Sequence, residues 1–400
     1  ARLEGEDLRR KEDDLRSLIK RGLKLELERR PTEFDLEQLK EYGELSHEAF
    51  HWVVEFPEAV VKEGTEYTVD FDIVVGNPPY GDLVTEVEER FISGYRTGSI
   101  RDIAAPFLER QLQLLADDGV FGNVITLRLI YDSNAYVSRA VLNEKLTETR
   151  IACFGWRPSY IFAGSEALAA VITGQKASEM DDDIQTSRFI LFSDEDRKQR
   201  LENIDYFQTD DLVLGETIGS GSIGESSDKS MPKVGTETAR NILEKLSKAS
   251  ETTIRDIEVN EKTEHTVWRK EGARYWINPL LESLWSEEDR SRETKPMYFE
   301  SKLERYTVFL LMQSSLFYNH WMTYGDQQHV SWKLVRSFPF PDKEDLKQND
   351  ELIEELAKEL WSGIEERFHP EINVSGEIQG VAELKPVVDQ VDELIGPMFG

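Results

Sequence analysis

The tetrapeptide Asn77-Pro78-Pro79-Tyr80 is the part of the sequence whose residue types best suit a chemical task. The amide oxygen of Asn77 and the backbone carbonyl of Pro78 are neighbouring hydrogen-bond acceptors. Pro78 and Pro79 hold the backbone in place, because each proline locks φ and neither donates an N–H. The ring of Tyr80 offers a flat surface on which a nucleobase could stack.

Two acceptors side by side suit the exocyclic amine of adenine. The lone pair of that amine is delocalised into the ring, so the amine is a poor nucleophile. Acceptors that hold its hydrogens can draw the lone pair out of conjugation and point it at an electrophilic methyl group without a strong base. Together with the aromatic surface, they predict a preorganised site for one base extruded from a duplex.

The residues ahead of the tetrapeptide indicate where it lies in a fold. Phe71–Gly76 is an apolar run of strand length, and α/β sheets present ligands at the carboxyl ends of their strands. Asn-Pro is also common in simple turns after a strand. The position directly after a strand favours the functional interpretation.

Residues 49–178 show short apolar strands alternating with helical patterns, which is typical of an α/β domain with a helix-flanked sheet. The pattern predicts strands at 71–76, 120–125, 151–154 and 167–173, and helices at 106–116 and 133–146. Residues 1–48 are charged and leucine-spaced, which predicts a solvated helical arm.

The remaining sequence divides into two regions. Residues 179–345 are rich in aromatic side chains and are expected to form a mixed α+β domain, whereas residues 346–400 predict an acidic amphipathic helix followed by a loose tail. Within the first region, Gly219–Gly224 has the spacing of a dinucleotide-binding loop. It lacks the preceding strand and following helix that such a loop needs, so a plain loop is favoured.

The composition limits the class of protein. The 400 residues carry a net charge of -30, which argues against extensive phosphate contacts. Acidic residues are spread along the whole chain, which favours adaptation to a salty cytoplasm, where the Debye length falls to about 3 Å near molar salt. The one cysteine, Cys153, cannot form an internal disulfide, and no apolar run could span a bilayer, so a cytoplasmic location is expected. The histidines show no metal-ligand spacing, so no metal is predicted.

Residues from about 50 to 176 resemble the catalytic domain of gamma-class N6-adenine DNA methyltransferases, especially the type IIG restriction-modification methylases. The resemblance is carried by Phe50–Trp52 and Phe56–Glu58, which precede Phe71–Tyr80. It implies a Rossmann-like sheet, S-adenosyl-L-methionine as the methyl donor, double-stranded DNA as the substrate, and a role in a restriction or phage-defence system. It also implies that Asn77–Tyr80 is the catalytic motif.

Two further segments resemble motifs of the same family. Phe107–Arg110 resembles the motif whose phenylalanine lies against the adenine ring of the cofactor, which makes Phe107 a candidate cofactor contact. Ile161–Gly164 resembles the motif whose aromatic residue helps to hold the flipped adenine, so Phe162 is a candidate second stacking surface opposite Tyr80. Either phenylalanine could instead be an ordinary core residue.

Leu310–Pro341 resembles the specificity region that follows the catalytic domain in these methylases, which implies a DNA target-recognition role. Its aromatic side chains are expected to be core more often than base contacts. The candidate DNA contacts in and near it are Lys302, Arg305, Lys333 and Arg336.

The family's cofactor loop, an acidic residue with closely spaced glycines, is expected upstream of the catalytic motif. The first 76 residues contain no such loop. This predicts a sheet that is incomplete at its N-terminal side, and a partner: an upstream half of the methylase, or a nuclease or specificity subunit. Two alternatives stay open, namely a catalytically silent DNA-recognition or defence component, and an N-methyltransferase that acts on RNA adenine or protein glutamine.

Overall fold

The computed structural model describes residues 59–63, 66–83, 89, 92–156, 161–162, 168–176, 184–209, 231–273, 277, 279–284, 294–369 and 377–400. The chain forms two compact units, residues 1–70 and residues 71–400. In the first unit, β1 (Val60–Glu63) pairs with β2 (Glu66–Val69) as an antiparallel hairpin. The arm expected at 1–48 and the glycine-rich segment 219–224 lie outside the described residues.

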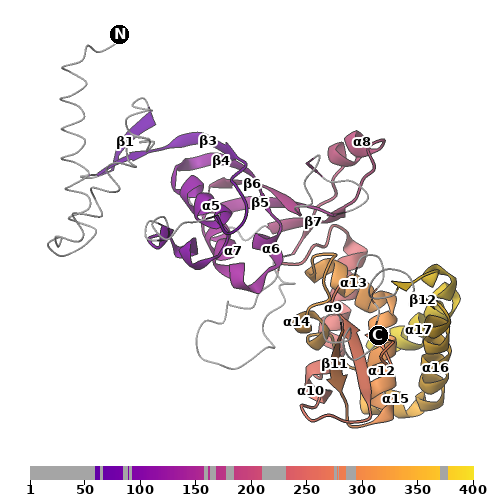
Figure 1. Ribbon diagram of the computed structural model, residues 1–400. Coiled ribbons are helices and arrows are strands. Elements are labelled where there is room, and N and C mark those ends of the chain that lie inside the picture. Colours follow the sequence, from indigo (N-terminus) through magenta and orange to yellow (C-terminus); the bar gives the residue numbers. More distant parts are fainter. Residues whose placement is uncertain are drawn as a thin grey trace, which may run out of the picture. The chain divides into compact units, whose positions relative to one another are not determined.

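The second unit is built on a central six-stranded sheet with the order β3-β4-β6-β5-β7-β8 (Figure 1). Its strands are β3 (Phe71–Gly76), β4 (Leu115–Thr126), β5 (Leu146–Phe154), β6 (Ala169–Lys176), β7 (Ile184–Ile190) and β8 (Phe207–Gln208). β3 is parallel to β4 and β5 is parallel to β7, while β6 runs antiparallel between β4 and β5. The carboxyl ends of β3, β4, β5 and β7 therefore share one edge of the sheet, and the expected α/β class with a central sheet is confirmed.

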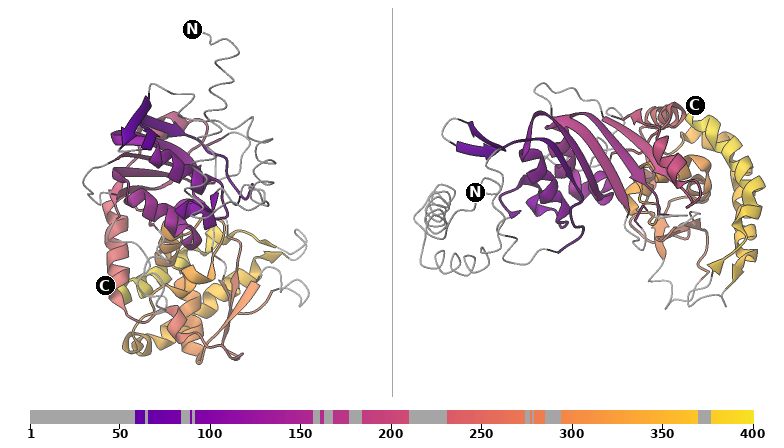
Figure 2. Two further views of the ribbon diagram at one scale, coloured as in Figure 1. Left: turned by 90° about the vertical axis from the view of Figure 1, so that its left-hand side faces the viewer. Right: turned by 90° about the horizontal axis from the view of Figure 1, so that it is seen from above.

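One face of this sheet is covered by α5 (Ala104–Gln113), α6 (Arg128–Tyr131) and α7 (Tyr136–Asn143), which lie together on one side in Figure 2. The helices bury an apolar stripe that includes Leu108 and Leu112 of α5. Alternate strand residues such as Phe121 and Ile125 point into the same core, as the two-residue period of a strand requires. This core holds the strands of the sheet against the helices that cover them.

The opposite face is apolar but open at β3 and β4. Ile73 is 66% exposed, Val75 73% and Val120 50%. Among the described strands, β3 is an edge strand. Parallel strands in α/β proteins usually have both faces buried. The apolar side chains of this face are typical of a buried surface, but no element in the described part of the chain covers them.

Some element boundaries differ from the expected ones. β4 begins at Leu115, within the segment expected to be helical, because α5 ends at Gln113 and the chain passes almost directly into the sheet. The helix expected at 133–146 is a short η4 (Ser133–Ala135) followed by α7, and Leu146 already belongs to β5. Strands β7 and β8 extend the sheet beyond residue 178, while the expected domain boundaries themselves stay predictions.

The region from residue 231 onward combines helices with a small three-stranded sheet of order β10-β9-β11. Its elements up to residue 336 are α9 (Glu237–Ala249), α10 (Ile254–Ile257), β9 (Thr266–Lys270), β10 (Pro279–Leu280), β11 (Thr294–Tyr298), α12 (Lys302–Gln313), α13 (Ser315–Tyr324) and α14 (Trp332–Arg336). Aromatic side chains such as Phe309, Phe317, Trp321 and Phe338 are fully buried here. The expectation that the aromatic side chains of Leu310–Pro341 are mostly core is confirmed for Phe317, Trp321 and Phe338.

The last region is more ordered than expected. It contains α15 (Lys343–Gln348), α16 (Asp350–Glu366), β12 (Phe368–His369), β13 (Glu377–Ile378), η5 (Val381–Leu384), α17 (Lys385–Ile395) and η6 (Gly396–Phe399). The helix at α16 agrees with the sequence analysis, but the expected loose tail is wrong. Val391, Ile395 and Phe399 are buried against the helical core, because α17 has an apolar stripe at helical spacing.

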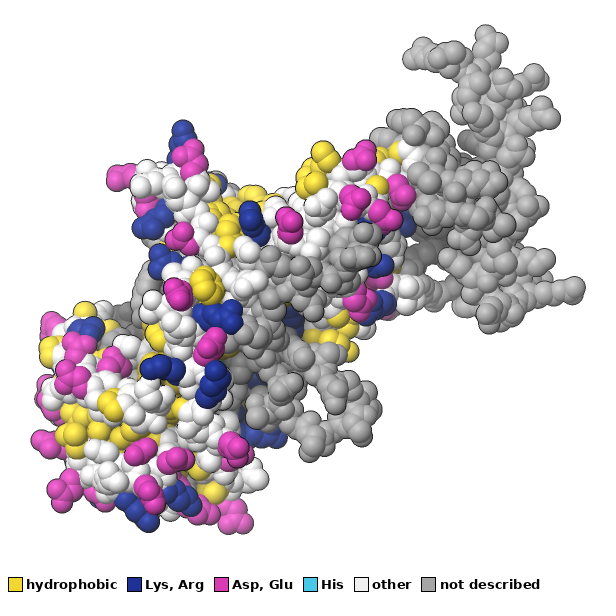
Figure 3. Space-filling model, turned by 180° about the vertical axis from the view of Figure 1, so that it is seen from behind, with side chains coloured by type: hydrophobic (Ala, Val, Ile, Leu, Met, Phe, Trp, Pro, Cys, Tyr) yellow, Lys and Arg dark blue, Asp and Glu magenta, His cyan; other side chains and the backbone are white. Residues whose placement is uncertain are grey.

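Surface charge follows the composition. Figure 3 shows Asp and Glu side chains distributed over the visible face, with Lys and Arg between them. In the part of the chain that is described, no group of three or more His, Cys, Asp or Glu side chains could hold a metal ion. No described helix combines the length and the apolar character that crossing a membrane requires.

Candidate functional site

The tetrapeptide Asn77–Tyr80 directly follows β3, at the sheet edge where the parallel strands end. Asn77 and Pro79 are exposed, whereas Pro78 is buried. Gly76 before it is packed so closely that a Cβ there would collide with the Gln111 side chain of α5. The strand before Asn77 and the consecutive prolines after it leave the backbone at Asn77 little freedom.

Asn77 and Tyr80 are joined by a hydrogen bond. The Tyr80 hydroxyl donates to Asn77 Oδ1 at 2.9 Å. The Tyr80 side chain is half-buried against the core under the sheet. Burial, and then the nearby Asp102 carboxylate, raise the pKa of Tyr80, so the hydroxyl stays protonated and remains a donor at neutral pH. The amide oxygen that is predicted to act in catalysis is thus oriented by the Tyr80 hydroxyl.

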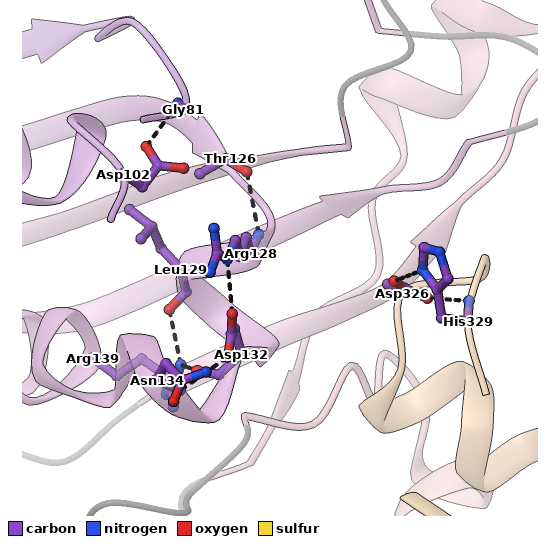
Figure 4. A network of polar contacts seen from close by, with 10 residues as sticks. All are labelled: Gly81, Asp102, Thr126, Arg128, Leu129, Asp132, Asn134, Arg139, Asp326 and His329. Atoms are coloured by element: carbon purple, nitrogen blue, oxygen red, sulfur yellow. Dashed lines mark hydrogen bonds and ion pairs between the residues drawn. The ribbon is translucent and has the colours of Figure 1, made fainter. Parts of the chain in front are cut away.

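Asp102 ties the loop after the tetrapeptide to the start of α5, as Figure 4 shows for its contact with Gly81. Its Oδ1 accepts from the Gly81 N–H at 3.2 Å and from the Ala104 N–H at 3.0 Å. The Ile103 N–H donates in turn to the Gly81 carbonyl at 3.0 Å. Gly81 has φ 99°, a conformation in which side chains other than glycine are strained. A buried carboxylate therefore sets where the tetrapeptide lies relative to the helix.

A second polar network lies where β4 ends (Figure 4). Arg128 Nε donates to Asp132 Oδ2 at 2.7 Å. The other oxygen of Asp132 accepts from the Asn134 N–H at 2.9 Å. The buried Arg139 donates to the carbonyls of Leu129, at 3.0 Å, and Asp132, at 2.8 Å. Burial lowers the pKa of Arg139 to about 10, so its guanidinium still carries a charge at neutral pH.

Phe107 lies on α5 and is 46% exposed, so it is not a core aromatic. It stands one helical turn before Gln111, the residue whose side chain lies against Gly76. Residues four apart share a helix face, so Phe107 belongs to the side of α5 that is turned towards the end of β3. Its assigned contact with a cofactor stays a prediction, and its exposure leaves the ring available for one.

Phe162 is half-buried and lies in the connection between β5 and β6. The carbonyl of its neighbour Ile161 accepts from Arg197 Nη2 at 2.7 Å, which anchors this part of the connection. Ala163 and Gly164, the remaining residues of the expected motif, lie outside the described residues. A position opposite Tyr80 stays a prediction.

Three of the four residues that were expected to contact DNA make side-chain contacts within the fold. Lys302 pairs with Glu354 at 2.6 Å. Arg305 donates to the carbonyls of Thr266 and Leu281, and Arg336 forms a two-pronged pair with Glu258. Lys333 also takes part in an interaction within the chain. These cations are engaged in structural contacts, which makes them weaker candidates for phosphate binding than the sequence alone indicated.

The sequence analysis did not anticipate that residues 326–329 of the C-terminal region reach the sheet edge. Asp326 Oδ2 lies 2.7 Å from His329 Nδ1, and Asp326 also hydrogen-bonds to Tyr131 of α6. Gln327 Oε1 accepts from the Trp156 N–H at 3.0 Å, just after β5. These contacts join residues that are far apart in the sequence, and no local pattern signals them.

A sequence model of the Eco57I restriction-modification methylase family matches residues 4–154. The chain is 33% identical over 76 residues to a putative type II restriction enzyme and methyltransferase of Methanocaldococcus jannaschii. It is 28% identical over 92 residues to the type II methyltransferase M.BstVI of Geobacillus stearothermophilus. The aligned stretches cover 19% and 21% of this chain, and 6% and 16% of those relatives. For residues 4–154, the expected resemblance to restriction-modification methylases is confirmed.

Two solved structures are also similar to the chain. The type IIL restriction-modification enzyme MmeI in complex with DNA matches 82% of this chain and 54% of its own, with a TM-score of 0.43 and 14% identity. A nuclease-deletion mutant of the type ISP enzyme LlaGI, in complex with a DNA substrate mimic, matches 74% of this chain and 35% of its own, with a TM-score of 0.40 and 12% identity. The chain therefore spans about half or less of the proteins that it matches.

Proposed function

We propose that this chain is the catalytic and DNA-recognising part of a site-specific DNA methyltransferase that transfers a methyl group from S-adenosyl-L-methionine to N6 of a flipped adenine. A restriction-modification or phage-defence system is the proposed setting. The observation that carries the proposal is the pair of acceptors at Asn77 and Pro78, held at the exposed carboxyl end of β3 with Tyr80 hydrogen-bonded beside them. The family match over residues 4–154 supports the same reaction class.

The proposed roles follow from the geometry of the tetrapeptide. The flipped adenine stacks on Tyr80, with Phe162 as the second stacking surface. Its N6 hydrogens are accepted by Asn77 Oδ1, which takes the place of the Tyr80 hydroxyl as partner, and by the Pro78 carbonyl. These two acceptors turn the nitrogen lone pair towards the methyl donor, and the proton that N6 loses passes to solvent. Pro79 keeps the backbone rigid during this exchange.

The cofactor assignment rests on Phe107. Its exposed ring, on the side of α5 that faces the end of β3, fits a flat aromatic contact with the adenine ring of S-adenosyl-L-methionine. When bound, the cofactor supplies an electrophilic methyl group. No second contact is assigned, because the expected glycine-rich loop is not found in the first 76 residues.

The open apolar face at Ile73, Val75 and Val120 supports a partner for the sheet. We assign this face to an upstream half of the methylase, which would complete a Rossmann-like sheet and carry the cofactor loop. The net charge of -30 supports a halophilic source and a salty cytoplasm as the working environment.

A catalytically silent DNA-recognition or defence component is the second candidate. The observation that favours it is that Phe107 is the only cofactor contact assigned among the candidate site residues. Such a component would keep the fold and bind DNA without methylating it.

The test is formation of N6-methyladenine in DNA after incubation with S-adenosyl-L-methionine in molar potassium chloride. The parent chain is compared with Asn77→Ala, and with Asn203→Ala as a matched control at an exposed asparagine after α8 (Arg197–Glu202). Methylation by the parent and the control but not by Asn77→Ala would support the enzyme and its catalytic residue. DNA binding by all three without methylation would rule out activity of this chain by itself, and would leave a part that needs its upstream half or a silent component.

A further inference from the structure

We propose that Arg128 binds a backbone phosphate of the DNA beside the flipped nucleotide. The inference rests on the proposed function in one respect, namely that DNA is the substrate. It assigns a phosphate-binding role to a residue that the sequence analysis did not select.

Arg128 lies in the right place for such a contact. It is the first residue of α6 and follows the end of β4 by two positions, while Asn77 follows the end of β3 by one. β3 and β4 are neighbouring parallel strands in which Gly76 pairs with Asn123, so β4 runs three residues further along the sheet than β3 before it ends. Asp102, which holds the loop after Tyr80, is close enough to Arg128 to act on its charge. Arg128 therefore lies at the same edge of the sheet as the tetrapeptide, in the neighbourhood of Asp102 and Gly81 (Figure 4).

The hydrogen-bonding groups of Arg128 are only partly used. Nε donates to Asp132, and the backbone N–H lies 3.4 Å from Thr126 Oγ1. Within the described ranges, the two terminal guanidinium nitrogens have no hydrogen-bond partner, and 44% of the side chain is exposed. A guanidinium held through Nε presents its other two nitrogens outward as a fork, the geometry that matches a phosphate.

The support under Arg128 is rigid. The Asp132 carboxylate is only 18% exposed, and it is itself fixed by the Asn134 N–H. Below it, the buried Arg139 clamps the carbonyls of Leu129 and Asp132 (Figure 4). Because the side chain is already ordered, binding a phosphate costs less conformational entropy than it would for a free surface arginine.

The charge distribution favours this assignment over the cations first considered. In a chain with a net charge of -30, phosphate contacts must come from a few well-placed cations. Arg305 and Arg336 each use Nε and one terminal nitrogen on a carbonyl or carboxylate of the fold, and Lys302 pairs with Glu354. Arg128 keeps two nitrogens available at the sheet edge where the tetrapeptide lies. Hydrogen bonding to Asp132 raises the pKa of Arg128, which keeps it fully charged.

The experiment measures binding of the whole chain to a fluorescein-labelled DNA duplex by fluorescence anisotropy over a range of potassium chloride concentrations. Each phosphate contact contributes roughly 0.9 to the slope of log affinity against log salt. We expect Arg128→Gln to lower that slope by about one and to weaken binding equally for duplexes of different sequence. Arg128→Lys should keep the slope, because it keeps the charge, while binding more weakly than the parent.

The matched control is Arg200→Gln. Arg200 is also an exposed arginine whose Nε pairs with an aspartate four residues away, at 3.2 Å from Asp196, but it lies on α8, beyond β7. Its slope should equal that of the parent. Circular dichroism checks that each variant is folded.

Each outcome separates this inference from the proposed function. An unchanged slope in a folded Arg128→Gln, with normal DNA binding by the parent, would overturn the role of Arg128 and leave the methyltransferase proposal standing. Equal losses of slope in Arg128→Gln and Arg200→Gln would also overturn it, since the contact would not be local. Failure of the parent to bind DNA at all would overturn both. DNA binding with the expected slope change but no methylation would leave Arg128 supported and would reject methylation by this chain alone.

Discussion

At the scale of single residues, the Tyr80 hydroxyl is hydrogen-bonded to the oxygen atom that the proposed chemistry needs. It donates to Asn77 Oδ1 at 2.9 Å. The same oxygen is proposed to accept from adenine N6. The Tyr80 hydroxyl would therefore hold the Asn77 amide in its orientation until the base binds. The aromatic ring is proposed to have a second and separate use as the stacking surface.

Substitution of Tyr80 separates these two uses. Tyr80→Phe keeps the ring and removes the hydrogen bond, whose net value is ~0.5–1.5 kcal/mol, so we expect methylation (kcat/KM) to fall roughly 2- to 10-fold. Tyr80→Ala also removes the stacking, worth ~1–3 kcal/mol per base, and should fall further. Tyr318→Phe, at another partly exposed tyrosine, is the control. Equal rates for Tyr80→Phe and the parent would show that the hydroxyl has no orienting role.

Much of the candidate site was predictable from the sequence because it is local. Asn77, Pro78, Pro79 and Tyr80 are consecutive, and the apolar strand before them fixes where they lie. Asp102 and Arg128 were not predictable, because the hydrogen bond of Asp102 with Gly81 and its electrostatic effect on Arg128 depend on how β3, β4 and α5 pack. Single polar residues in helical or loop sequence carry no mark of such contacts.

At the scale of elements, α13 and α14 enclose a buried histidine. The ring of His320 packs against Tyr324 and Phe338, with centroids 5.1 and 5.2 Å away. Its Nε2 lies 3.3 Å from the carbonyl of Leu334 in α14. Burial lowers the pKa of His320 to about 4, so the ring is neutral in the folded protein near pH 7. The packing of these helices therefore depends on an uncharged imidazole.

This cluster predicts a pH dependence of stability. The unfolded chain binds a proton at His320 near pH 6.5, whereas the folded chain binds it only near pH 4. The free energy of unfolding is therefore at its full value above pH 6.5. It falls as the pH drops from 6.5 to 4, by ~3 kcal/mol in total. His320→Gln can still hydrogen-bond to Leu334 but cannot titrate, so it should lose ~2 kcal/mol less than the parent between pH 7 and pH 5. Urea unfolding at the two pH values measures the difference. Identical pH dependence in both proteins would contradict the buried neutral state.

Element types were easier to predict than element limits. The strand at 71–76 and the long acidic helix near 352–368 have strong periodicity, and the structure has both. The start of β4 at Leu115 was missed because its residues Ala116–Gly119 are mostly polar or small and resemble a helix end. α17 was missed because its short stripe of apolar residues is interrupted by acidic ones. A helix of this length is stabilised mainly by its tertiary packing.

At the scale of the whole molecule, the net charge of -30 dominates. Acidic side chains are distributed over the face seen in Figure 3, so their repulsion acts on the fold as a whole and not on one patch. Salt screens such repulsion, with a Debye length that shrinks from about 10 Å at 0.1 M to about 3 Å at 1 M.

We therefore expect the melting temperature to rise by several degrees between 0.1 M and 1 M potassium chloride, since ~1 kcal/mol shifts Tm by roughly 2–4 °C in domains of 150–250 residues. Differential scanning calorimetry measures it, and sucrose at equal osmolarity is the control for effects unrelated to charge. A Tm that stays constant or falls with salt, or that rises equally with sucrose, would contradict adaptation to a salty environment.

The contact between Gln327 and the end of β5 has a consequence for protein engineering. Gln327 has φ 64°, accepts from the Trp156 N–H, and lies where a Cβ on Gly155 would have to be. The connection that carries Phe162 begins at this point. A chimaera that borrows its C-terminal region from a relative would thus receive a different contact on that connection along with the proposed DNA-recognition region. An exchange of the C-terminal region should give a folded protein only when residues 325–330 and the pair Gly155–Trp156 come from the same parent.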